Sequence, residues 1–158
     1  MHEFMILKAC SVLIHAPNTP RIKEVIWNPP IVSCIKCNTD GTAKECPGPA
    51  ACGGIFRDNI ADVVGCFTEN LNISTVFHAE LIGAMHAIEI ASKGCLSLWL
   101  ETDSQLVSLT FKNHSIVPWR LRNRWLDCIE LTKNMRFIVY HIFREDNCCA
   151  DKLASLGL

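Results

Sequence analysis

The residues of this chain best suited to chemistry are four acids, each inside its own short and distinctive run. These runs are Asn38-Thr-Asp-Gly41, His78-Ala-Glu-Leu81, Glu101-Thr-Asp-Ser-Gln105 and Ala150-Asp-Lys-Leu-Ala154. Asp40 and Asp103 each come where an apolar, strand-like run ends, whereas Glu80 and Asp151 lie within helix-like segments. Carboxylates gathered from strand ends and facing helices form the oxygen-lined sites that hard divalent cations such as Mg²⁺ prefer. The pattern therefore predicts a site for divalent cations.

Each acid taken alone also has a purely structural explanation. Asp40 suits a turn and Asp103 suits a helix N-cap, while Glu80 and Asp151 suit exposed positions on helices. The surroundings argue for chemistry, because Glu80 lies among Ala79, Leu81, Ile82 and Ala84, and the strand that leads to Asp103 has no polar residue from Leu98 to Leu100. A buried carboxylate without a basic partner costs free energy unless it binds a cation or a proton.

The elements expected to position these acids follow from the apolar periodicity and from the turn residues. The pattern predicts strands over residues 31–39, 50–57, 60–68, 96–100 and 135–142, and helices over about 74–92, 104–111, 118–133 and 147–156. The first three strands form an antiparallel meander stopped by Asp40-Gly41 and by Asp58-Asn59, and the fourth and fifth are parallel. Glycines 53 and 54 inside a strand indicate a bulge or the close approach of another backbone. This order predicts an α/β fold, a mixed five-stranded sheet with flanking helices.

Length and composition indicate one globular domain in a soluble chain. The chain has 158 residues, of which 49% are hydrophobic and 20% are charged. Residues 1–30 carry four prolines and are predicted to be a leader or linker remnant, with a short helix over Met1 to Leu13, and residues 31–158 are predicted to be the domain. No apolar run approaches the ~20 residues of a membrane span, and the start does not resemble a signal peptide. We therefore expect an intracellular protein of the nucleus or cytoplasm that is not secreted.

The ten cysteines are expected to be free thiols, because a chain of this length needs no disulfides and they are scattered through apolar runs. A zinc site built from Cys34, Cys37, Cys46 and Cys52 is a weak alternative. Residues three apart on a strand point to opposite faces, which does not suit metal ligation.

The charge balance shifts along the chain although the net charge is only −1. Residues 1–111 carry 7 basic and 11 acidic side chains, a balance of −4, and residues 112–158 carry 8 and 5, a balance of +3. Two Mg²⁺ ions bound at the four acids would cancel the local negative charge and make the site attractive to phosphate.

Taken together and in order, the four runs resemble those of the type 1 ribonuclease H domain, in the form found in plant retroelement-derived, reverse transcriptase-like proteins. The resemblance covers about Ile31 to Leu156, and its last run extends back to His141 as His-Ile-Phe-Arg-Glu-Asp-Asn-Cys-Cys-Ala-Asp-Lys-Leu-Ala154. It implies a ribonuclease H-like fold and endonucleolytic hydrolysis of the RNA strand of RNA–DNA hybrids, leaving 5′-phosphate and 3′-hydroxyl ends. The implied cofactor is two Mg²⁺ ions, with Mn²⁺ as a substitute.

The resemblance also assigns roles to residues. It implies that Asp40 bridges both metals, that Glu80 and Asp103 hold one, that Asp151 completes the other, and that His141 assists proton transfer or product release. It implies nucleic-acid contacts at Gly41, Thr42, Ser104 and Gln105, and the spacing of Arg120 and Arg124 on the expected helix makes them candidate phosphate contacts. The two arginines, four residues apart, are equally compatible with a solvated helix face.

A second hypothesis is a retroelement-derived nucleic-acid-binding module with the same fold and little or no turnover. It is favoured by the modest charge and by the lack of a separate basic lobe between about Asn113 and Pro118. Under either hypothesis the expected partner is an RNA–DNA hybrid, with no membrane and no obligate protein partner.

Overall fold

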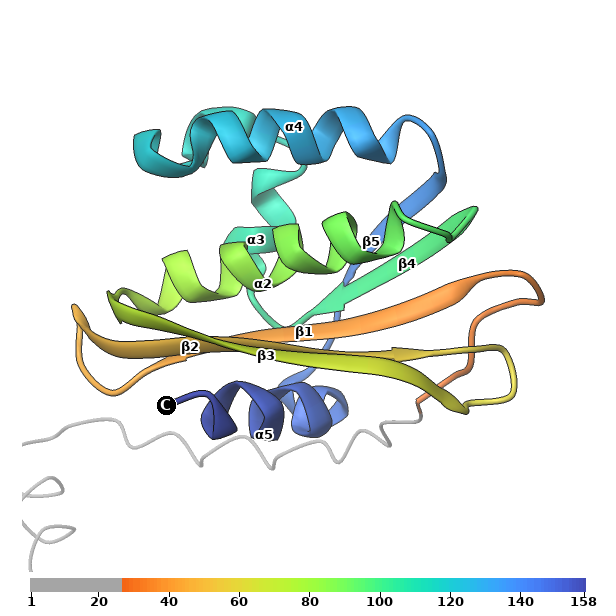
Figure 1. The fold of residues 1–158 in the computed structure, drawn as a ribbon, viewed down its shortest axis with the longest axis horizontal. Helices are drawn as coiled ribbons and strands as arrows, with labels where there is room; N and C mark the ends of the chain where they lie inside the picture. Colours follow the sequence, from red (N-terminus) through yellow and green to blue (C-terminus); the bar gives the residue numbers. More distant parts are fainter. Residues whose placement is uncertain (1–26) are drawn as a thin grey trace, which may run out of the picture.

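In the computed structural model of the chain, residues 27–158 are described, and they form a five-stranded sheet with helices on both faces (Figure 1). The strands are β1 (Ile35–Ala43), β2 (Gly48–Arg57), β3 (Val63–Ser74), β4 (Ser97–Thr102) and β5 (Arg136–His141), in the order β3-β2-β1-β4-β5. β1, β2 and β3 pair antiparallel, and β4 pairs in parallel with both β1 and β5. The predicted mixed sheet is confirmed. The predicted helix over Met1 to Leu13 and most of the predicted leader lie outside the described residues.

The α-helices are α2 (Val76–Ala91), α3 (Gln105–Thr110), α4 (Arg122–Thr132) and α5 (Cys148–Leu156), with 3₁₀ turns η1 (His114–Ile116), η2 (Trp119–Leu121) and η3 (Arg144–Asn147). Figure 1 shows α2 packed on one face of the sheet with α4 above it, and α5 alone on the opposite face. No helix among the described residues is both long and apolar enough to cross a membrane.

Helix α2 begins where the sequence predicted, because Thr75 is its N-cap and the Thr75 hydroxyl accepts a hydrogen bond from the backbone N–H of His78. Its alanines at 84, 87 and 91 are fully or almost fully buried, which lets the helix approach the sheet closely. Leu81, Met85 and Ile88 fill the core between α2, β4 and α4, where they meet Leu98, Leu100 and Trp125.

Several predicted boundaries are wrong, and the third strand, predicted over residues 60–68, runs over Val63–Ser74. The first strand does not begin at residue 31 or stop at Asp40-Gly41, because residues 31–34 form a turn and β1 continues to Ala43. Gly41 continues the β1–β2 pairing opposite Cys52, and its missing side chain leaves room for the backbone of α2 at Glu80. The helix predicted from Pro118 to Lys133 is divided into η2 and α4, which meet between Leu121 and Arg122.

Gly53 explains how α5 reaches the sheet. A Cβ atom on Gly53 would lie 2.5 Å from the backbone nitrogen of Ala154. Of the two explanations predicted for this glycine, the close approach of another backbone is confirmed. The shifts in β2–β3 register fall elsewhere, between Pro49 and Ala51 and between Phe56 and Arg57. The glycine thereby allows α5, which carries Asp151, to lie directly on the strands beside Asp40.

Candidate active site

All four acids line one polar cavity of about 260 Å³. Asp40 comes from β1, Glu80 from α2, Asp103 from the residue after β4 and Asp151 from α5. The remaining wall residues are Gly41, Thr42, Ala43, Val76 and Arg144. Residues separated by up to 111 positions in the chain, from Asp40 to Asp151, therefore meet at one place, as the sequence predicted.

The sheet topology explains why Asp40 and Asp103 meet. β1 and β4 are adjacent and parallel, with Asn38 opposite Glu101 and Thr39 opposite Thr102. Asp40 is the next residue of β1 and Asp103 is the residue after β4, so the two lie side by side where this parallel pairing ends. Their proximity is a direct consequence of the strand order.

Burial and mutual repulsion oppose ionisation in the cavity. Asp40 is 8% exposed, and burial, together with the charges of Asp103, Asp151 and Glu80, raises its pKa to about 7. Burial also raises the pKa of Glu80, and the Asp103 charge adds to this effect while a hydrogen bond from Ser104 opposes it. A cavity that destabilises carboxylate charge in this way attracts cations.

Three of the four acids, Glu80, Asp103 and Asp151, each contact one polar or basic side chain. The Ser104 hydroxyl donates a hydrogen bond to Oε2 of Glu80. Nδ2 of Asn147 donates to Oδ1 of Asp103 over 2.7 Å, and Nη2 of Arg144 lies 3.6 Å from Oδ1 of Asp151. Sequence reasoning missed Arg144 and Asn147. The only signal for them was their place in the run between His141 and Asp151.

The four carboxylates are the groups of this cavity that could hold Mg²⁺. Within residues 27–158, no three His, Cys, Asp or Glu side chains are grouped closely enough to hold a metal ion in their present positions. The carboxylates of Glu80, Asp103 and Asp151 instead contact Ser104, Asn147 and Arg144. The donor set itself, four carboxylates around a small polar cavity, is of the kind that a hard cation such as Mg²⁺ takes.

The other predicted site residues lie at different distances from the cavity. Gly41 and Thr42 are on its wall, and Ser104, only 7% exposed, adjoins it through Glu80. His141 is exposed, and its Nε2 lies 3.1 Å from the carbonyl oxygen of Asp103. Gln105 is exposed at the first position of α3.

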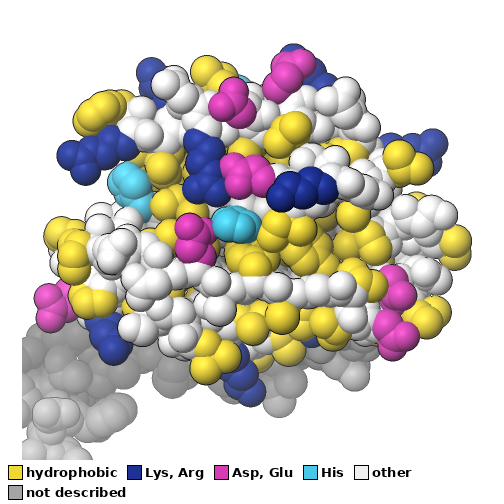
Figure 2. All heavy atoms as spheres, viewed as in Figure 1, with side chains coloured by type: hydrophobic (Ala, Val, Ile, Leu, Met, Phe, Trp, Pro, Cys, Tyr) yellow, Lys and Arg dark blue, Asp and Glu magenta, His cyan; other side chains and the backbone are white. Residues whose placement is uncertain are grey.

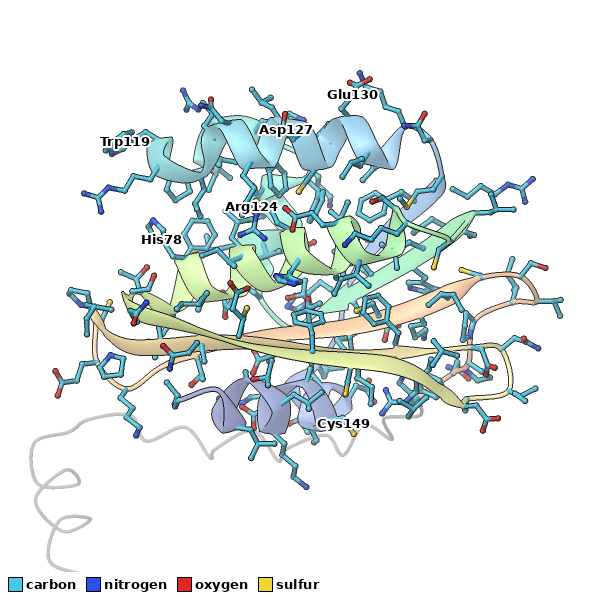
Figure 3. All side chains as sticks on the ribbon, in the orientation of Figure 1. His78, Trp119, Arg124, Asp127, Glu130 and Cys149 are labelled. Carbon is cyan, nitrogen blue, oxygen red and sulfur yellow. The ribbon has the colours of Figure 1, made fainter. Side chains whose placement is uncertain are left out.

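The two predicted arginine contacts are not on the cavity wall. Nε and Nη2 of Arg124 donate to the two carboxylate oxygens of Glu89 over 2.7 and 2.8 Å, and Figure 3 shows this side chain reaching from α4 toward α2. Arg120 is exposed, with its guanidinium 5.5 Å from the ring centroid of Trp119. Figure 2 shows basic and acidic side chains interspersed over α2 and α4 rather than gathered into one basic patch.

The zinc alternative finds no support in the described residues. Cys34, Cys37 and Cys52 are buried while Cys46 is exposed, and all nine cysteines of residues 27–158 are free. No group of metal ligands is formed there by cysteines.

A five-stranded mixed sheet with this order and an acidic cavity at the β1–β4 edge defines a ribonuclease H-like fold. The family model described as "Reverse transcriptase-like" matches residues 38–157, and the chain belongs to that family.

The comparisons with individual proteins agree with this assignment. The chain is 32% identical over 139 residues to the "Putative ribonuclease H protein At1g65750" of Arabidopsis thaliana, a match that covers 86% of the chain and 22% of that protein. The chain thus spans about a fifth of the length of this relative. RNase H1 of the archaeon Halobacterium salinarum is similar in structure, with a TM-score of 0.70, 26% identity, and coverage of 78% of this chain and 96% of that one. LC11-RNase H1, solved in complex with an RNA/DNA hybrid, shares the fold at a TM-score of 0.68 and 21% identity, covering 77% of this chain and 94% of that one.

Proposed function

We propose that this chain hydrolyses the RNA strand of RNA–DNA hybrids endonucleolytically, with Mg²⁺ or Mn²⁺ as the cofactor, and leaves 5′-phosphate and 3′-hydroxyl ends. The observation that carries the proposal is that four acids from four separate elements line one cavity. Membership of the reverse transcriptase-like family supports it, as does similarity to proteins named for ribonuclease H.

Asp40, Glu80, Asp103 and Asp151 are the residues that would hold two metal ions. Bound there, the ions would supply an activated water and stabilise the leaving oxygen of the scissile phosphate. Each acid comes from a different element, so the packing of α2 and α5 on the sheet sets their relative positions. This dependence on packing makes the site sensitive to substitutions at the interfaces between these elements.

We assign proton transfer to His141, whose ring contacts the backbone of Asp103. The Asp103 carbonyl oxygen can only accept a hydrogen bond, so the proton of the neutral ring is on Nε2 and the lone pair is on Nδ1. Nδ1 is therefore the nitrogen that accepts a proton from water or substrate. The exposure of His141 allows it to exchange that proton with solvent.

Arg144 provides a positive charge on the cavity wall, and an arginine keeps this charge at any ordinary pH. Its guanidinium lies beside Asp151 while the side chain remains largely exposed. An arginine in this position suits a phosphate oxygen of the strand that enters the cavity. Arg144 and His141 thus supply the cationic and proton-transferring groups of the described site.

Substrate choice follows from shape rather than from base sequence. Gly41 and Thr42 on the cavity wall and the exposed Gln105 are the groups nearest to an incoming RNA strand. Recognition of RNA in a duplex relies on 2′-hydroxyls and groove shape, so we expect little base specificity. Arg120 is the better phosphate contact of the two arginines, because Arg124 is engaged by Glu89.

The test is cleavage of an RNA-labelled hybrid by the purified chain in Mg²⁺, in Mn²⁺ and in chelator, at low salt. We expect cuts within the RNA strand in either metal, none in chelator, and none in duplex DNA. The Asp103→Asn variant, which keeps the shape of the side chain, should reduce cleavage at least 100-fold while it remains folded. An intact hybrid in both metals would refute the proposed activity.

One structural observation favours the second candidate, a binding module with little turnover. Helix α2 carries no lysine or arginine, α4 carries only Arg122 and Arg124, and Arg124 is already paired with Glu89. Binding of the hybrid in chelator, with no cleavage after metal is added, would support this candidate over the enzyme.

A further inference from the structure

Asn147 joins three of the elements that build the site. It is 1% exposed, it stands at the end of η3, and it directly precedes α5. Its Nδ2 donates to the carbonyl oxygen of Thr39 over 2.9 Å and to Oδ1 of Asp103 over 2.7 Å. Thr39 is the residue before Asp40, so one side chain ties the start of α5 both to β1 and to the residue after β4.

The orientation of the Asn147 amide is determined by these partners. A backbone carbonyl and a carboxylate both accept hydrogen bonds, so the group that faces them must be the NH₂. Both of its hydrogens are used. A flipped amide would place its oxygen against two acceptors and would be repelled by both.

A capping role does not account for Asn147. Asparagine at a helix N-cap normally uses its side-chain oxygen to accept a hydrogen bond from the first turn. Asn147 is the N-cap residue of α5, yet its side chain makes no such bond. Both N–H groups of the side-chain amide instead donate to Thr39 and Asp103. These partners indicate that Asn147 helps to position the residues of the site.

The chemistry of the contact also suits a site that binds cations. Within residues 27–158, the hydrogen bond from Asn147 is the one that the Asp103 carboxylate accepts. A lysine or arginine here would neutralise that carboxylate and compete with a metal ion. A neutral amide orients the carboxylate and leaves its negative charge in place.

We propose that Asn147 is a positioning residue that orients the Asp103 carboxylate for metal binding and fixes α5, with its Asp151, against β1 and β4. The inference rests on the proposed function. Asn147 lies four residues before Asp151, which is one helical turn, so displacement of its side chain would disturb Asp103 and Asp151 together.

The test compares Asn147→Ala with Thr110→Val in the full chain. Thr110 is a suitable control because it is fully buried, and its hydroxyl donates to the Leu106 carbonyl within α3 rather than to the site. Three quantities are measured: Mn²⁺ affinity by calorimetry without nucleic acid, kcat and KM for hybrid cleavage, and thermal unfolding.

For Asn147→Ala we expect Mn²⁺ affinity and kcat to fall about 10- to 100-fold, the range typical for partners of metal ligands. KM for the hybrid should change less than about threefold. Thr110→Val should lower the unfolding temperature and leave Mn²⁺ affinity and kcat unchanged. If Asn147→Ala fails to fold, Asn147→Ser, which keeps a small donor, takes its place and should give an intermediate loss.

The outcomes separate the two claims. A wild-type chain that cuts the hybrid, paired with an Asn147→Ala variant of unchanged Mn²⁺ affinity and kcat, overturns the role of Asn147 and leaves the proposed function standing. A wild-type chain that does not cut the hybrid refutes the proposed function. The Mn²⁺ measurement then still decides whether Asn147 positions Asp103.

Discussion

The Ser104 hydroxyl donates a hydrogen bond to Oε2 of Glu80, so the N-cap residue of α3 holds a carboxylate carried by α2. The same hydroxyl accepts a hydrogen bond from the backbone N–H of Val107 and caps α3. Ser104 thus links the geometry of the site to the start of a helix that is itself outside the cavity.

Replacing Ser104 by alanine should lower kcat for hybrid cleavage roughly 10-fold, because the Glu80 carboxylate loses its orienting donor. The hydrogen bond lowers the pKa of Glu80, so its loss should also move the acid limb of the pH–rate profile to higher pH. Ser104→Thr, which keeps the hydroxyl, should restore both quantities. Ser108→Ala, also on α3, is the control, and equal effects from both alanine variants would contradict a specific role for Ser104.

The sequence was sufficient to predict the meeting of the four acids, because their runs occur in the order and setting of a known family. It was not sufficient to place Asp40 inside a strand. That placement depends on the backbone of α2 lying against Gly41, and a contact between segments far apart in the chain leaves no periodic signal.

The same reasoning explains why Asn147 and Arg144 were missed. Both lie in η3, a single irregular turn whose side-chain directions follow from the packing of α5 rather than from a repeating pattern. Helix α2, in contrast, has a capping threonine and a regular stripe of apolar residues, and its bounds were predicted closely.

Replacing Asp40 by asparagine should stabilise the metal-free protein at neutral and alkaline pH. Burial and the neighbouring carboxylates raise the pKa of Asp40 to about 7, well above the ~3.9 of an unfolded chain. The folded state therefore binds this proton more tightly, and the free energy of unfolding falls as the pH rises from about 4 to about 7.

Asp40→Asn removes that loss, so in chelator at pH 8 it should be more stable than the wild type by on the order of 2–4 kcal/mol. Near pH 3, below both pKa values, the two proteins should be equally stable. Urea denaturation across pH measures the difference. Asp127→Asn, at an exposed position on α4, is the control, and equal stability of Asp40→Asn and wild type at pH 8 would contradict the prediction.

Replacing Gly41 by alanine should damage both stability and cleavage. The added methyl group would overlap the backbone nitrogen of Glu80, so α2 must move away from β1 and carry Glu80 with it. We expect a loss of about 1–3 kcal/mol in the free energy of unfolding and a large fall in kcat.

Gly94→Ala is the matched control for this prediction. A Cβ atom at Gly94 would have no heavy atom within 4 Å outside the adjacent residues. The φ angle of Gly94 is not positive, so alanine fits the backbone there. Urea denaturation should show this variant within about 0.5 kcal/mol of the wild type. A Gly41→Ala variant with normal stability and kcat would show that α2 does not depend on this close approach.

Lys36 forms a buried ion pair with Glu101. Its Nζ lies 2.7 Å from Oε1 of Glu101, the two side chains are 2% and 7% exposed, and the rings of Trp27 and Trp99 flank the ammonium. Lys36→Met leaves the Glu101 charge buried and should cost about 3–5 kcal/mol.

The double variant Lys36→Met with Glu101→Gln should be more stable than Lys36→Met alone. The glutamine removes the uncompensated charge and still accepts the hydrogen bond that Nδ2 of Asn38 gives to Glu101. Chemical denaturation of the four members of this double-mutant cycle measures the coupling. Additive effects of the two substitutions would show that Lys36 and Glu101 are not energetically coupled.

Glu89 and Arg124 join α2 to α4 through a two-point ion pair. The hydrogen bond from Arg124 holds the pKa of Glu89 below its usual value, so the folded state releases this proton more readily than the unfolded chain. The resulting stabilisation is present above the pKa of the unfolded chain, about 4.3, and is lost as the pH falls through the lowered pKa of the folded state.

Glu89→Gln should therefore lower the free energy of unfolding by about 1 kcal/mol at pH 7 and by almost nothing below the lowered pKa, as measured by urea denaturation across pH. Glu130→Gln, which breaks the more exposed pair with Lys133, should cost less than about 0.5 kcal/mol at any pH. Because freeing Arg124 adds an available cation on α4, Glu89→Gln should also keep or increase hybrid affinity at low salt. A large fall in hybrid affinity with unchanged stability would show instead that Arg124 must be held by Glu89 in order to meet nucleic acid.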